Sequence, residues 1–170
     1  YAGAQKNMGS AGTNLVVVNK NILGKVKRAI PSIMDYRNHI QAKSMLNTPP
    51  VFAIYVSMLT LRWLKEKGGV EVIEKLNNEK AALLYQAIDD SHLFRPTAAK
   101  EDRSKMNICF VMEDPAKEKS FLEFAKQNDI YGIKGHRSVG GFRASLYNAL
   151  PLSSVQYLVG KMKEFESTNG

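Results

Sequence analysis

The sequence has few of the residues that would point to a secreted or membrane-spanning protein. It contains a single cysteine, Cys109, so an internal disulfide is excluded. No stretch reaches the ~18 uninterrupted apolar residues that a spanning helix needs. The opening residues 1–3 also lack the basic flank and apolar run of a signal peptide. We therefore expect a cytoplasmic protein that does not bind a membrane.

Acidic residues are scarce relative to basic ones. The 170 residues include 16 Asp and Glu against 24 Lys and Arg, a net charge of +8, which predicts attraction to anions such as phosphorylated small molecules or nucleic acid. The basic residues are scattered, without the interleaved aromatics of a single-strand-binding groove. We expect no nucleic-acid partner and no metal. With 44% apolar residues, the chain can bury one good core.

The first part of the chain reads as an incomplete domain followed by a long connection. Four consecutive apolar residues, 15–18, are typical of a strand buried on both faces, and a short helix is expected over 23–27. The polar stretch 31–47 has weak periodicity and predicts a connection. A single buried strand without visible partner strands suggests that the chain begins within a larger domain.

Two helices are expected in the middle of the chain. Residues 51–59 are apolar on nearly every side, which predicts a buried helix with Thr48 as its N-cap and an end at Gly68. Over 70–89 the pattern is amphipathic, with apolar residues at helical spacing opposite a charged face. That apolar face consists of Ile73, Leu76, Leu83, Leu84 and Ile88.

The remainder alternates between strands and helices, which predicts a small αβ sandwich. Strands are expected over 106–112, 130–133 and 142–147, and helices over 115–127 and from Ser153, as its own cap, to about 165. Cys109 is expected to pack in the core of its strand. In the strand 142–147 alternation buries Phe142 and turns Arg143 to the other face.

Two groups of residues could carry chemistry. Lys6 lies among small uncharged neighbours, where partial desolvation would lower the pKa of its ammonium and make it a nucleophile. Taken alone, however, these residues favour a surface lysine in a glycine-rich turn. His136, Arg137 and Arg143 surround a Gly-Gly pair. Arginine suits forked contacts with carboxylate or phosphate, but these residues could also simply face solvent.

Three strings in this order, AGAQKN, NTPP and GHRSVGGFRASLYNA, make the chain similar to the phosphoserine aminotransferase family. The resemblance covers essentially the whole chain and is closest to the carboxy-terminal portion of these class-V, fold-type-I enzymes, which use pyridoxal 5'-phosphate (PLP). It implies an α/β fold: the end of the large PLP-binding domain over 1–30, a connection with a cofactor-phosphate contact over 31–50, and a small C-terminal αβ domain, a sheet covered by helices, over 51–170.

The resemblance also implies a role for each matching residue. Lys6 would hold PLP covalently and move the proton, with Gln5 against the cofactor phosphate. Asn47 and Thr48 would reach the cofactor phosphate of the other subunit of a homodimer. Substrates would be held by three basic residues, Arg143 on the α-carboxylate and His136 with Arg137 on the phosphate group.

The implied reaction is reversible transamination between glutamate and 3-phosphohydroxypyruvate, giving phosphoserine and 2-oxoglutarate in serine biosynthesis, with a further role on the phosphohydroxythreonine intermediate of pyridoxine biosynthesis. Lacking an upstream half, the chain alone is expected to be inactive. Ser10 stands where the family commonly has proline. Two alternatives stay open: a non-catalytic basic αβ domain that binds phosphorylated ligands, and another fold-type-I PLP enzyme. Against a desulfurase stands Cys109, expected in a strand core rather than a mobile loop.

Overall fold

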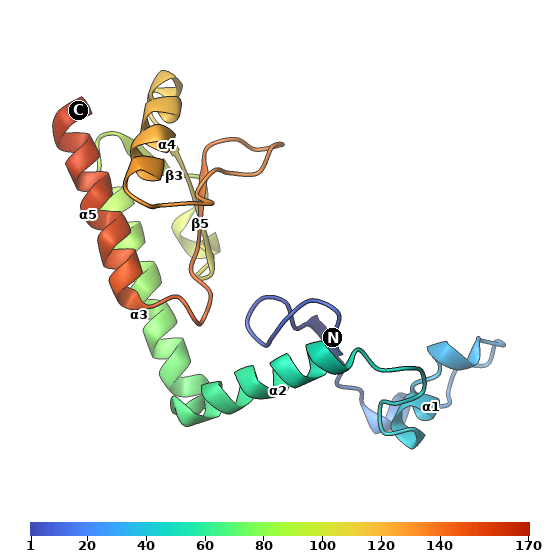
Figure 1. Cartoon of the computed structure of the whole chain (residues 1–170). Coiled ribbons are helices and arrows are strands. Elements are labelled where there is room, and N and C mark those ends of the chain that lie inside the picture. Colours follow the sequence, from blue (N-terminus) through green and yellow to red (C-terminus); the bar gives the residue numbers. More distant parts are fainter. The chain divides into compact units, whose positions relative to one another are not determined.

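The computed structural model describes all residues from 1 to 170, which form two compact units, Tyr1–Glu66 (unit 1) and Lys67–Gly170 (unit 2) (Figure 1). Helices combined with small antiparallel sheets confirm the predicted α/β class. None of the helices is long and apolar enough to cross a membrane.

Unit 1 has little regular sheet. Strand β1 (Ala2–Gly3) pairs with β2 (Asn14–Leu15), and η1 (Lys20–Ile22), η2 (Ser32–Met34), α1 (Tyr36–Gln41) and α2 (Val51–Glu66) follow. The predicted buried strand over 15–18 is wrong: β2 has only β1 as a neighbour, and Val17 is 85% exposed. The predicted helix over 23–27 is also wrong, because Gly24 has a φ of 74°, outside the right-handed helical region.

Helix α2 ends close to the expected Gly68 but is much less buried than expected. The Pro50 carbonyl accepts the N–H of Ile54, so the helix begins at Val51, and Thr48 precedes it instead of capping it. Only Ala53 and Ser57 are buried on this helix. Most of the large apolar side chains of unit 1 are exposed, so this unit buries very little core of its own.

Unit 2 is an antiparallel sheet of order β3-β4-β5, covered on one face by helices. Strand 130–133 was predicted but is wrong, because positive φ angles at Asp129 (57°) and Gly132 (72°) interrupt it and leave an isolated bridge at Lys134. Helix α5 begins with Pro151 at its N-cap, which corrects the cap predicted at Ser153. The elements of unit 2 are, in chain order, α3 (Gly69–Asp89), β3 (Phe94–Pro96), η3 (Lys100–Asp102), β4 (Asn107–Met112), η4 (Pro115–Lys117), α4 (Glu118–Gln127), β5 (Phe142–Ser145) and α5 (Leu152–Asn169).

The core of unit 2 lies between the sheet and helices α3, α4 and α5, of which α3 and α5 run side by side (Figure 1). Alternation along β5 is as predicted: Phe142 is buried and Arg143 exposed. Cys109 corrects another expectation. It pairs with Arg143 across the sheet and is half-buried, on the face opposite Phe110 and the core. The aromatic centre comprises Phe94, Phe110, Phe121, Phe142 and Phe165.

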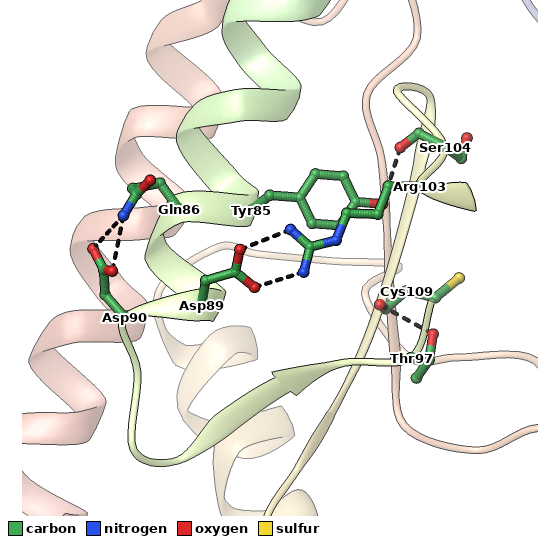
Figure 2. A network of polar contacts seen from close by, with 8 residues as sticks. All are labelled: Tyr85, Gln86, Asp89, Asp90, Thr97, Arg103, Ser104 and Cys109. Carbon is green, nitrogen blue, oxygen red and sulfur yellow. Dashed lines mark hydrogen bonds and ion pairs between the residues drawn. The ribbon is translucent and has the colours of Figure 1, made fainter. Parts of the chain in front are cut away.

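A polar network ties α3 to the segment that leads into β4 (Figure 2). The Arg103 guanidinium donates to both carboxylate oxygens of Asp89, at 2.7 and 2.6 Å, and lies 4.5 Å from the ring centroid of Tyr85. The Tyr85 hydroxyl donates to the Ser104 carbonyl at 3.0 Å. The hydrogen bond from Arg103 holds the pKa of Asp89 below its ordinary value. This network fixes the entry of β4, the central strand.

Candidate functional site

Lys6 lies on a tight turn at the start of unit 1. The Met8 N–H donates to the Ala4 carbonyl at 3.0 Å, and the Ala4 N–H donates to the Thr13 carbonyl at 2.9 Å. Ala4 is 3% exposed and anchors the turn, whereas Gln5 and Lys6 are exposed. Unit 1 itself therefore does not supply the partial desolvation expected around Lys6.

The Lys6 turn rests directly on α2. Gly9 has a φ of 155°, and a Cβ built on it would lie 2.7 Å from the Cα of Ser57. Such an approach to backbone is possible only for glycine. Beside this contact lies a mostly apolar groove of about 460 Å³. Its lining comes from the turn and from one face of α2: Ala4, Met8, Thr13, Asn14, Leu15, Ile54, Ser57, Met58, Leu61, Arg62 and Lys65.

Asn47 and Thr48 lie just before α2, separated from it by Pro49 and Pro50. Both are exposed, and the Asn47 side-chain amide donates to the Thr48 carbonyl at 3.3 Å. Unit 1 thus carries all four residues predicted to contact the cofactor. Two lie on the turn that packs against α2, and two lie on the segment before α2. Their polar groups, an amine, two amides and a hydroxyl, can bind a phosphate or form a covalent link.

His136 and Arg137 lie on the hairpin loop between Lys134 and β5. The Gly135 N–H donates to the Gly141 carbonyl at 2.8 Å, and the His136 carbonyl accepts the Val139 and Gly140 N–H groups. Gly141 has a φ of 59°, and a Cβ there would approach the Phe110 carbonyl to 2.7 Å, so the loop needs glycine. His136 and Arg137 are exposed on this loop.

Arg143 lines a groove of about 450 Å³ in unit 2, which we call the Arg143 groove. The Arg143 N–H donates to the Ile133 carbonyl at 2.7 Å, which joins β5 to the segment 129–133 that also lines the groove. The lining residues are Asp129, Ile130, Tyr131, Gly132, Ile133, Arg143, Ala144, Ser145, Leu146, Leu150, Ser153, Ser154, Tyr157 and Leu158, so His136 and Arg137 lie outside it. The lining contains several hydroxyl groups and the Asp129 carboxylate besides Arg143, whose guanidinium is suited to binding a carboxylate.

A residue that the sequence reading missed is Lys80, whose side chain is fully buried on α3. Its Nζ donates to the carbonyls of Leu146, Tyr147 and Leu150, at 3.2, 2.9 and 3.1 Å. Burial lowers the pKa of this ammonium from its ordinary value. The sequence spacing could have predicted its burial, since Lys80 falls seven residues after Ile73 and therefore on the apolar face of the amphipathic pattern.

Comparison with known proteins gives the family. The family model described as "Aminotransferase class-V" matches residues 1–158. The chain belongs to the class-V aminotransferase family. The resemblance carried by the AGAQKN, NTPP and GHRSVGGFRASLYNA strings is thereby confirmed at the level of the family.

Individual class-V aminotransferases are similar to nearly the whole chain. The phosphoserine aminotransferase of Porphyromonas gingivalis is 59% identical over 169 residues, 98% of this chain but 47% of the relative. Among solved structures, phosphoserine aminotransferase from Bacillus circulans subsp. alkalophilus is 40% identical, with a TM-score of 0.93 over 99% of this chain and 47% of its own. A PLP-bound phosphoserine aminotransferase from Trichomonas vaginalis is 42% identical, with a TM-score of 0.87 over 95% and 46%. The chain spans about half the length of the relatives it matches.

Proposed function

We propose that this chain is part of a PLP-dependent phosphoserine aminotransferase. The reaction is the reversible transfer of an amino group between glutamate and 3-phosphohydroxypyruvate, giving phosphoserine and 2-oxoglutarate. The observation that carries the proposal is the 59% identity with a phosphoserine aminotransferase over 98% of the chain. Arg143 at a groove and Lys6 on a rigid turn give that similarity a chemical meaning.

The residues of unit 1 fit PLP by the chemistry of their polar groups. PLP has an aldehyde and a phosphate, and supplies an electron sink for the bond-breaking step at the substrate α-carbon. Lys6 offers the amine for the aldehyde end. Gln5, Asn47 and Thr48 offer the amide and hydroxyl donors for the phosphate, the last two in the other subunit of a homodimer.

Lys6 has two tasks in the proposed reaction. Its Nζ would hold the cofactor covalently between turnovers, and as a free amine it would take the proton from the substrate α-carbon and move it as a general acid and base. The turn suits this because Ala4 is buried and Gly9 packs against α2, which fixes the backbone on both sides while the lysine side chain is exposed.

The substrates are anions, and the proposed ligands include two arginines. Arg143 forms a forked contact with the α-carboxylate that glutamate and phosphoserine share, and His136 with Arg137 holds the phosphate group of the second substrate. The net charge of +8 favours the approach of these anions. Asp129 and Tyr131 also line the groove, and the Tyr131 hydroxyl donates to Asp129 Oδ1 at 3.2 Å.

The intact enzyme is proposed to be a cytoplasmic homodimer. The apolar side chains that unit 1 exposes support this, because such a surface is usually covered by another part of an assembly. In the intact enzyme we expect large apolar side chains of unit 1 such as Val17 and Phe52, which are 85% and 77% exposed in this chain, to be covered. In this proposal residues 1–30 end the large domain, 31–50 form the connection and 51–170 form the small domain. The phosphohydroxythreonine step of pyridoxine biosynthesis is proposed as a second activity.

Half-burial of Cys109 does not favour the desulfurase alternative. The thiol lies on β4, the central strand, which is hydrogen-bonded to β3 on one side and to β5 on the other. A persulfide-forming thiol needs a mobile, accessible segment instead. The amino-group transfer therefore remains the better reading of the site.

The test is a chimera that carries this chain in place of the matched residues of the Porphyromonas gingivalis relative. Purified chimera is supplied with PLP, phosphoserine and 2-oxoglutarate, and glutamate formation is followed. We expect turnover that disappears in Lys6→Ala and persists in Lys20→Ala, a matched exposed lysine of unit 1. A folded chimera without turnover, or one that releases sulfur from cysteine instead, would contradict the proposal.

A further inference from the structure

Lys80 is a buried charge whose partners are all backbone carbonyls. Its side chain has no exposed surface, and none of the ion pairs in the structure includes it. The three acceptors, Leu146, Tyr147 and Leu150, belong to the turn between β5 and α5. An ammonium has three donors, so the three bonds use its full donor capacity. An apolar residue would fill the same space without the desolvation cost of a charge, so a role beyond packing is indicated.

A second polar residue of α3 holds the same turn. Asn77, 6% exposed and one helical turn before Lys80, donates from its side-chain amide to Asn148 Oδ1 at 2.8 Å. On its other side the turn is tied to the sheet, because the Leu146 N–H donates to the Met106 carbonyl at 2.7 Å. The segment is therefore held at several points, four of them from one face of α3.

The held turn forms part of the Arg143 groove. Leu146 and Leu150 both line the groove, and Leu146 comes three residues after Arg143 on the same extended segment. Any slip of the turn would move these two walls and change the direction in which β5 presents the guanidinium. We propose that Lys80 is a positioning residue for the substrate carboxylate: it fixes the turn 146–150 and thereby the walls of the Arg143 groove. The inference deepens the proposed function and rests on it for the identity of the carboxylate.

The structural part of the proposal is tested on the 170-residue chain alone by amide hydrogen exchange and backbone chemical shifts. Lys80→Met removes the three donors, and Glu79→Met, at the exposed neighbouring position, is the matched control. We expect faster exchange and shifted resonances over 143–150 in Lys80→Met only. Changes confined to α3 would overturn the proposal. If Lys80→Met does not fold, Lys80→Arg decides, because its planar fork cannot reach three converging carbonyls and should perturb the same residues.

The functional part is read in the chimera as a split between KM and kcat. Lys80→Met removes the three hydrogen bonds from the ammonium to the turn. This loss should raise KM for glutamate and for phosphoserine about tenfold, with a smaller change in kcat. Equal losses in kcat and in the amount of active enzyme, with KM unchanged, would mean that Lys80 serves folding only and would overturn the proposal. An inactive parent chimera would count against the proposed function, while the exchange measurement would still decide the role of Lys80.

Discussion

Gly9 offers a sharp test of how the Lys6 turn is held. An alanine there meets two separate costs: the backbone has a φ of 155°, and its Cβ would lie 2.7 Å from the Ser57 Cα and 2.3 Å from the Ser57 Oγ. Gly12 provides the matched control, since its φ of 105° is also one that alanine rarely adopts but its Cβ would meet only the Ala53 Cβ at an ordinary 3.5 Å.

The magnitudes follow from these distances. A strained backbone costs about 1–3 kcal/mol for either alanine, offset in both by the lower entropy of the unfolded chain. Only Gly9→Ala adds a clash with the backbone of α2, worth about another 1–3 kcal/mol by analogy with overpacked cores. We therefore expect Gly9→Ala to lower the free energy of unfolding of unit 1 by about 1–3 kcal/mol more than Gly12→Ala.

The assay uses Trp63, the only tryptophan, which lies on α2 and reports on unit 1. Urea unfolding followed by its fluorescence should give a lower midpoint for Gly9→Ala than for Gly12→Ala. Hydrogen exchange over residues 1–13 gives a second readout should the Gly9→Ala unit already be unfolded without urea. Equal destabilisation by the two variants would refute the close packing of the Lys6 turn on α2.

Two further predictions concern unit 2. In the chimera, Arg143→Gln should lower kcat/KM at least about 30-fold, because truncating one partner of a close charge pair costs about 2 kcal/mol or more. Arg95→Gln, on the same sheet, should leave kcat/KM unchanged. Equal effects of the two variants would exclude Arg143 as the ligand of the substrate carboxylate. Because the bond from Arg103 depresses the pKa of folded Asp89, its contribution to stability is complete above the unfolded pKa of about 3.9 and is lost as pH falls through the lower folded value. Because the pair lies at the surface and is screened by solvent, Asp89→Asn should cost only about 0.5–1 kcal/mol at neutral pH and progressively less in acid. The measurement is urea unfolding at several pH values with Asp90→Asn as control, and a pH-independent difference would contradict this.

Patterns that depend on local periodicity were predictable. The amphipathic face with Ile73 and Leu84 gave α3 correctly, because a helix that lies on a core must repeat its apolar residues every three to four positions. Alternation gave the two faces of β5, with Phe142 inward and Arg143 outward. The three strings AGAQKN, NTPP and GHRSVGGFRASLYNA identified the family without any knowledge of the fold.

Burial was less predictable, because it depends on the surfaces that pack against a segment. The apolar run at 15–18 was read as a buried strand, yet β2 pairs with β1 alone and leaves Val17 exposed. The apolar pattern from 130 to 133 was read as a strand, yet positive φ angles at Asp129 and Gly132 prevent a continuous ladder. Lys80 was overlooked since charged residues are rarely buried, and only the three carbonyls of a distant turn explain why this one is.

Identifying the lysine that holds PLP tests the central proposal most directly. The chimera is incubated with PLP, treated with borohydride to fix lysine-bound cofactor to its lysine, and mapped by peptide mass spectrometry, alongside the 170-residue chain alone. We predict a single labelled site at Lys6 in the chimera, its loss in Lys6→Ala, and no specific labelling of the chain by itself. Specific labelling at another lysine, or at none in a folded chimera, would contradict the assignment of Lys6 and with it the proposed aminotransferase.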